Sequence, residues 1–128
     1  MLRQPTVLVL DDDESILAAF QDFLRKERCI MIAARSAEEA LQKMKSERVD
    51  LLITDVRLKL QSGVTFFMKV KIETPHLPVI VMTGYSGILS EHEVKAYGAD
   101  YFFLKPLELD KLRKAVRKCL HLVDNEIS

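Results

Sequence analysis

The stretch VLVLDDDESI, residues 7–16, joins two features that are seldom neighbours. A run of aliphatic residues that suits a buried β-strand is followed directly by three carboxylates, Asp11–Asp13. Continuous rather than alternating hydrophobicity is typical of a parallel strand that is covered on both faces. The stretch therefore predicts a strand over Thr6–Leu10 in an α/β sheet, with acidic side chains at its carboxyl end.

The composition indicates a single globular domain with no strong charge bias. The chain has 128 residues, and its 19 Lys and Arg balance its 19 Asp and Glu. The net charge of the whole chain therefore does not favour binding to nucleic acid or to a membrane surface. No apolar run is long enough to span a bilayer, and the N-terminus lacks the pattern of a signal peptide. Cys29 and Cys119 lack a C-x-x-C spacing, which predicts reduced thiols in a cytoplasmic protein.

Short apolar runs alternate with helical patterns along the chain. The further strands are expected at Ile30–Ala34, Leu51–Thr54, Val79–Met82 and Tyr101–Leu104. Helical faces are predicted by apolar residues spaced three or four apart: Leu17, Phe20 and Leu24; Ala37, Ala40, Leu41 and Met44; Val64, Phe67, Met68 and Ile72; Leu109, Leu112, Val116, Cys119 and Val123. The fourth helix, within Gly87–Tyr97, has the least regular pattern. Strand–helix alternation repeated five times predicts a doubly wound parallel sheet with right-handed crossovers, in three α/β/α layers.

Local signals mark the ends of several helices. Asp13 is suited to cap the first helix, and Ser36 followed by Glu39 is typical of a capping box that opens the second. Gly98 suits the C-terminal end of the fourth helix.

Polar residues follow four of the predicted strands. Asp11 and Asp12 follow the first strand, Asp55 the third, Thr83 the fourth and Lys105 the fifth. The carboxyl ends of parallel strands meet at one edge of the sheet, so these side chains are expected in one pocket. Two carboxylates about 4 Å apart repel by roughly 4 kcal/mol at an effective dielectric of about 20. Lys105 offsets part of this repulsion, and oxygen ligands without His or Cys favour Mg²⁺ or Mn²⁺ for the rest.

Such a set of groups suits phosphoryl transfer to a carboxylate. A strand-end Asp attacks phosphorus and becomes an acyl phosphate, while the metal and Lys105 neutralise the phosphoryl oxygens and Thr83 donates a hydrogen bond. One alternative is a phosphatase resembling the haloacid dehalogenases, because Asp11–Ser15 reads D-x-D-x-S and the first Asp would then be the nucleophile. A second alternative is a docking module that is never phosphorylated.

Over nearly its whole length the sequence resembles the receiver domain of bacterial two-component response regulators. The residues that carry the resemblance are VLVLDDDES, LLITDVRLKLQSG, PVIVMTGYS and YFFLKP, in this order. Two longer stretches, PVIVMTGYSG and GADYFFLKPLELDKL, resemble receivers of transcriptional activators in particular. The resemblance implies a flavodoxin-like, five-stranded parallel sheet of order 2-1-3-4-5 with five helices. It also implies a receiver domain over residues 1–121, followed by a polar tail or linker over 122–128.

The resemblance also assigns roles to individual residues. Asp55 matches the phosphoacceptor, and Asp11 and Asp12 match the acidic pair that binds Mg²⁺, with Asp12 the direct ligand. Arg57 falls where the family supplies a backbone carbonyl to the metal. Lys105 matches the phosphate-binding lysine.

The remaining matches concern the switch. Thr83 matches the hydroxyl that moves toward the phosphate, and Phe102 matches the aromatic residue that turns inward. These movements change the face made by the fourth helix, fifth strand and fifth helix. The bond before Pro106 is cis in the family. The protein would therefore be a phosphorylation switch and no enzyme beyond its own phosphorylation and slow dephosphorylation.

The resemblance implies partners of several kinds. A sensor histidine kinase or histidine phosphotransfer protein would supply the phosphoryl group, and an output domain or downstream protein would respond. A homodimer that forms on phosphorylation is a further expectation, whereas this domain would bind neither nucleic acid nor membrane itself.

Two departures from the family pattern follow Asp55. Leu58-Lys59 stands where Met-Pro is usual, which adds a positive charge near the site. Arg57 is long and cationic at a position that shields the phosphoryl group from water, and this predicts slow autodephosphorylation.

Overall fold

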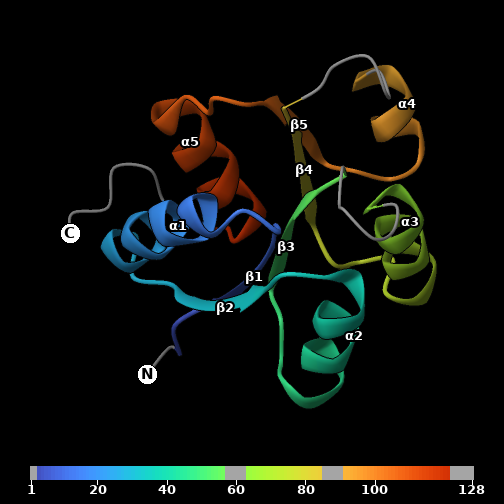
Figure 1. Cartoon of the computed structure of the whole chain (residues 1–128), viewed down its shortest axis with the longest axis horizontal. Helices are drawn as coiled ribbons and strands as arrows, with labels where there is room; N and C mark the ends of the chain where they lie inside the picture. The colour runs from blue at the N-terminus through green and yellow to red at the C-terminus, as the bar shows by residue number, and fades with distance from the viewer. Residues whose placement is uncertain (1–2, 57–62, 85–90, 122–128) are drawn as a thin grey trace.

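The computed structural model describes residues 3–56, 63–84 and 91–121 of the chain (Figure 1). Arg57, Leu58-Lys59 and Val123 lie outside the described residues, as do residues 87–90 of the predicted fourth helix. The expectations that concern them remain predictions.

Strands and helices alternate along the described chain, as the sequence predicts. The elements are β1 (Thr6–Leu10), α1 (Glu14–Lys26), β2 (Ile30–Ala34), α2 (Ala37–Ser46), β3 (Leu51–Asp55), α3 (Gly63–Glu73), β4 (Val79–Thr83), α4 (Glu91–Ala96), β5 (Tyr101–Leu104) and α5 (Leu109–Cys119). All neighbouring strands pair in parallel, in the order β2-β1-β3-β4-β5. The predicted fold class and strand order are confirmed.

The sheet separates two apolar cores. Helices α1 and α5 cover one face, and α2, α3 and α4 cover the other (Figure 1). Alternate residues of β1 supply the two cores: Val7 and Val9 pack toward α1 and α5, and Leu8 and Leu10 pack on the opposite side. Every residue of β1, β3 and β4 is buried, which confirms that continuous hydrophobicity marks strands covered on both faces.

Two strands are one residue longer than predicted. Asp55 is the last residue of β3 and pairs with Met82, while Thr83 is the last residue of β4 and pairs with Leu104. A polar side chain does not end a strand when the backbone ladder continues, and here Val56 N–H still donates to the Met82 carbonyl at 3.2 Å. Both residues are therefore held by the sheet and do not belong to loops.

The helix starts largely follow the predicted capping signals. The Asp13 carboxylate accepts the Ser15 N–H at 2.9 Å and caps α1. The Ser36 hydroxyl accepts the Glu39 N–H at 3.1 Å, but the Glu39 carboxylate bonds to the Arg35 N–H instead of the Ser36 N–H. The reciprocal half of the capping box is thus shifted by one residue, to the N–H of the residue before the N-cap.

Two predicted helical faces need correction. Ile72 is 77% exposed on α3, whereas Phe67 is buried as predicted, together with Phe66 and Val70. Because α3 is apolar on more than one side, residue spacing alone does not select the stripe that meets the sheet. Leu109 is 61% exposed, because it opens α5 beside a shallow apolar groove at the start of the helix.

Helix α4 ends at Ala96, two residues before Gly98, as the glycine predicts. Gly98 has a φ of +112°, and a Cβ there would approach the Lys71 side chain to 3.2 Å. None of the helices in the described ranges combines the length and hydrophobicity needed to cross a bilayer.

Candidate functional site

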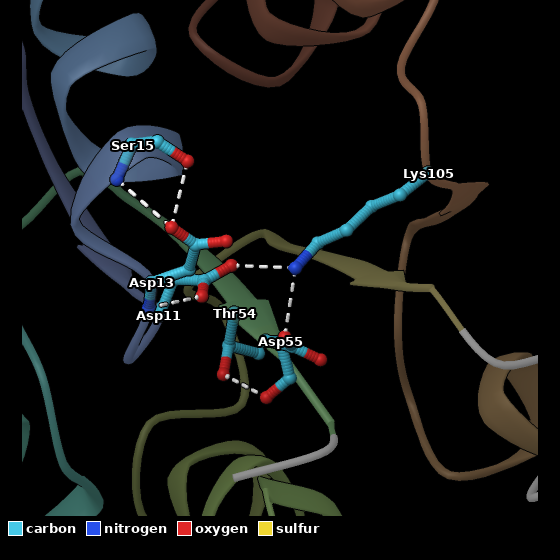
Figure 2. A network of polar contacts seen from close by, with 6 residues as sticks. All are labelled: Asp11, Asp13, Ser15, Thr54, Asp55 and Lys105. Carbon is cyan, nitrogen blue, oxygen red and sulfur yellow. Dashed lines mark hydrogen bonds and ion pairs between the residues drawn. The ribbon is translucent and has the colours of Figure 1, made fainter.

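Three charged side chains converge at the carboxyl edge of the sheet. The Lys105 ammonium lies 2.8 Å from Asp11 Oδ2 and 2.9 Å from Asp55 Oδ2. Figure 2 shows Lys105 reaching across from the segment after β5 to carboxylates that follow β1 and end β3. The structure therefore brings together three of the residues that the sequence predicts to share a pocket.

The sheet register explains why these side chains meet. β1 and β3 are neighbours with Leu10 opposite Thr54, so the residues that follow, Asp11 and Asp55, lie next to each other. Lys105 is tied to the adjacent strand, because its N–H donates to the Thr83 carbonyl at 2.9 Å. The Lys105–Pro106 peptide bond is cis, as predicted.

Burial gives this pair of carboxylates unusual electrostatics. Asp11 is fully buried and Asp55 is 5% exposed. Burial raises the pKa of Asp11 above its ordinary value, although hydrogen bonds from Lys105 and from the Asp13 N–H oppose the shift. Burial would lower the pKa of Lys105, but its hydrogen bonds to Asp11 and Asp55 outweigh this and raise it. The ammonium is thus held charged between two carboxylates.

Further hydrogen bonds fix the carboxylates and the strand end. Asp11 Oδ1 accepts the Asp13 N–H at 2.9 Å, so both oxygens of this buried carboxylate have partners (Figure 2). The buried Thr54 hydroxyl donates to the Asp55 carbonyl at 3.0 Å. Sequence reasoning missed these two supporting contacts. The i, i+2 spacing of Asp11, Asp13 and Ser15 was the available signal, since Asp side chains readily accept the N–H two residues on.

The two predicted switch residues lie on the neighbouring strands. Thr83 is buried at the carboxyl end of β4, at the same edge as Asp55. Phe102 lies on β5 opposite Val81, is partly buried and packs against the core on the α4 side of the sheet. Thr83 therefore lies on the strand next to β3, and Phe102 belongs to the same core as Val94 of α4.

A family comparison agrees with this geometry. The model for the response regulator receiver domain matches residues 7–117. The chain belongs to this family. Receiver domains are phosphorylation-activated signalling switches and not classical enzymes, so this receiver domain is a component of two-component signalling. The match decides against the phosphatase that resembles the haloacid dehalogenases.

The chain covers different shares of the proteins to which it is similar. The transcriptional regulatory protein ZraR of Escherichia coli K12 is 32% identical over 123 residues, which are 94% of this chain but only 28% of ZraR. The chain thus spans little more than a quarter of that relative. Sporulation initiation phosphotransferase F of Bacillus subtilis is 30% identical over 93% of this chain and 96% of its own length.

Solved receiver domains have the same fold. The receiver domain protein from Methanospirillum hungatei has a TM-score of 0.86 at 26% identity, covering 93% of this chain and 95% of that one. The beryllofluoride-activated NtrC4 receiver domain dimer has a TM-score of 0.84 at 28% identity, covering 91% and 96%.

The metal site is only partly assembled in the described residues. Receiver domains generally bind Mg²⁺ at the phosphorylation site. Asp11 and Asp55 offer adjacent carboxylate oxygens, which fit a hard cation. However, across residues 3–56, 63–84 and 91–121 no three His, Cys, Asp or Glu side chains converge as a metal-binding group. Asp12 is half-buried and does not complete such a group with the other two carboxylates, so its role as direct ligand stays a prediction.

Proposed function

We propose that Asp55 is the phosphoacceptor of this receiver domain. The observation that carries the proposal is the Lys105 ammonium, which bridges the Asp11 and Asp55 carboxylates at 2.8 and 2.9 Å. An Asp55 oxygen attacks phosphorus, the bond from phosphorus to the donor breaks, and the leaving group departs with its electron pair. The product is an acyl phosphate whose added negative charge faces Lys105.

The neighbouring residues have separate roles in this proposal. Lys105 keeps its position beside Asp55 and neutralises a phosphoryl oxygen. Asp11, Asp12, Asp55 and the Arg57 carbonyl would hold Mg²⁺, or Mn²⁺, which supplies charge neutralisation when bound. Thr83 donates a hydrogen bond to the phosphoryl group. Phe102 then packs further inward and changes the surface of α4, β5 and α5.

We also propose the partners that this chemistry requires. A sensor histidine kinase or a histidine phosphotransfer protein donates the phosphoryl group, in the cytoplasm. Its docking site would include the apolar groove of α1 and the start of α5, since Leu107 in its lining is two residues from Lys105. An output domain or downstream protein reads the changed surface, and phosphorylation promotes a homodimer. No direct contact with nucleic acid or membrane is proposed.

The proposed receiver domain spans residues 1–121, and 122–128 form a polar tail or the start of a linker. The family match over residues 7–117 and the end of α5 at Cys119 support these limits.

The test is intact-protein mass spectrometry after incubation with acetyl phosphate and Mg²⁺. We expect one added phosphoryl group on the wild type and none on Asp55→Asn or in the presence of EDTA. Persistence of the modification in Asp55→Asn would contradict the assignment.

The same experiment on Asp11→Asn separates the two candidate nucleophiles. Both Asp11 oxygens are already occupied, by the Asp13 N–H and by Lys105, and the side chain is fully buried. We therefore expect Asp11→Asn to slow modification through weaker metal binding, while Asp55→Asn abolishes it. Complete loss in Asp11→Asn together with retention in Asp55→Asn would identify Asp11 as the nucleophile.

A further inference from the structure

We propose that Asp13, which has no part in the metal and phosphoryl roles above, is a positioning residue for the Asp11 carboxylate. The inference rests on the proposed function, because it concerns how one carboxylate of that site is oriented. It assigns a purpose to the third member of the acidic run.

Asp13 contacts Asp11 through its backbone. Its N–H donates to Asp11 Oδ1 at 2.9 Å, while Asp11 Oδ2 accepts from Lys105 at 2.8 Å (Figure 2). A carboxylate is planar, so two partners on different oxygens fix its orientation as well as its position. The Asp13 N–H therefore decides which oxygen of Asp11 faces Lys105 and the phosphoacceptor.

The side chain of Asp13 holds that N–H in place. Asp13 Oδ1 accepts the Ser15 N–H at 2.9 Å and the Ser15 hydroxyl at 2.7 Å. The Asp13 carbonyl accepts the N–H groups of Ile16 and Leu17, at 3.1 and 3.2 Å. Asp13 is thus both the N-cap of α1 and the residue whose N–H orients the Asp11 carboxylate. The start of α1 is therefore linked by a hydrogen bond to the site.

Supporting groups of this kind have measurable effects on metal sites. Removal of a hydrogen bond that orients a metal-binding carboxylate typically lowers metal affinity by about 10-fold or more. Asp13→Ala removes the cap and loosens residue 13, whereas Asp13→Asn and Asp13→Ser keep a side-chain oxygen that can cap the helix.

The chain provides a matched control in the second helix. Ser36 caps α2 through a 3.1 Å bond from the Glu39 N–H, and none of its described hydrogen bonds involves Asp11, Asp55 or Lys105. Ser36→Ala therefore removes a helix cap of the same kind without touching Asp11. An effect of Asp13→Ala that Ser36→Ala lacks is therefore not a general consequence of losing a helix cap, and Asp13→Asn separates it from the loss of charge.

The experiment measures Mn²⁺ binding to the unphosphorylated protein, with free Mn²⁺ determined by electron paramagnetic resonance. We expect about 10-fold weaker binding in Asp13→Ala, near wild-type binding in Asp13→Asn and Asp13→Ser, and no change in Ser36→Ala. Equal losses in Asp13→Ala and Asp13→Asn would overturn the proposal, because the effect would then come from the charge of Asp13. Unchanged binding in Asp13→Ala would overturn it as well.

Hydrogen exchange of the residue-13 amide gives a second test that needs no metal. We expect slow exchange in the wild type and Asp13→Asn, and faster exchange in Asp13→Ala. If the wild type bound no Mn²⁺, the metal-binding part of the proposed function would be wrong. The exchange rates of the residue-13 amide would then be the test of whether Asp13 positions Asp11. Equal exchange rates in all three proteins would overturn it.

Discussion

The two edges of the sheet use the same kinds of charged residue in different ways. At the amino edge, Asp50 accepts the Thr6 N–H at the start of β1, at 2.8 Å, and pairs with Arg3. Asp100 likewise accepts the Val79 N–H at the start of β4, at 2.8 Å, and lies 3.7 Å from Lys71. At the carboxyl edge, by contrast, two carboxylates share one lysine.

Burial and charge balance explain the difference in function. The Asp50 and Asp100 side chains are 22% and 44% exposed, and each has a cation beside it and a strand N–H to satisfy. The Asp11 and Asp55 side chains are 0% and 6% exposed, and they outnumber their shared Lys105. A buried site with an unbalanced negative charge attracts a cation, whereas a balanced and exposed pair only stabilises the fold.

Among the substitutions that compare the two edges, the largest effect is expected at the shared lysine. Lys105→Met removes the ammonium that bridges Asp11 and Asp55 and that the proposed mechanism places against the phosphoryl oxygens, so we expect phosphorylation by acetyl phosphate to slow by about 100-fold. The rate is measured by mass spectrometry at fixed Mg²⁺, with Lys71→Met as the amino-edge control. A loss of similar size in Lys71→Met would remove the contrast between the two edges.

The amino-edge lysine should affect stability instead. The Lys71 ammonium donates to the Leu77 carbonyl at 2.8 Å and to the Pro75 carbonyl at 3.1 Å, besides its ion pair with Asp100. Lys71→Met keeps the side-chain stem but loses these bonds, so we expect a destabilisation of about 2 kcal/mol. Urea unfolding at neutral pH measures it. An unfolding midpoint equal to that of the wild type would show that water replaces these bonds without cost.

A smaller effect is expected from Arg57, two residues after the proposed phosphoacceptor Asp55. Its length and charge should hinder an attacking water, so we expect Arg57→Asn to shorten the phosphoryl half-life several-fold. The half-life is followed after removal of the donor. An unchanged half-life would rule out this shielding role.

The smallest effect concerns a thiol at the amino edge. Burial raises the pKa of Cys29 from 9.0 to about 11. A raised folded-state pKa contributes stability that is present below pH 9.0 and is lost as the pH rises through about 11. We therefore expect the free energy of unfolding to fall less steeply over this range in Cys29→Ala than in the wild type. Parallel pH profiles would show that this thiol does not contribute.

Much of the site could be predicted because it follows from sheet topology. Asp55, Thr83 and Lys105 each lie at the end of an apolar run, and parallel strands bring such ends to one edge. The cap at Asp13 and the glycine at position 98 were also predictable, since both signals act within a few residues. Other features depended on contacts between distant residues. Ile72 and Leu109 fit helical periodicity, yet both are exposed. For Ile72 the reason is that periodicity does not say which side of a broadly apolar helix meets the sheet, whereas Leu109 is the first residue of α5.

The sequence by itself determined the alternation of strands and helices, the parallel sheet and the edge of the sheet at which the charged residues meet, because hydrophobic pattern and chain connectivity leave few alternatives. Only the tertiary structure decided how the charges are shared. Lys105 binds carboxylates 94 and 50 residues away, and the burial of Asp11 sets the direction of its pKa shift. These properties arise from packing among segments that are far apart in the chain, so no local pattern encodes them.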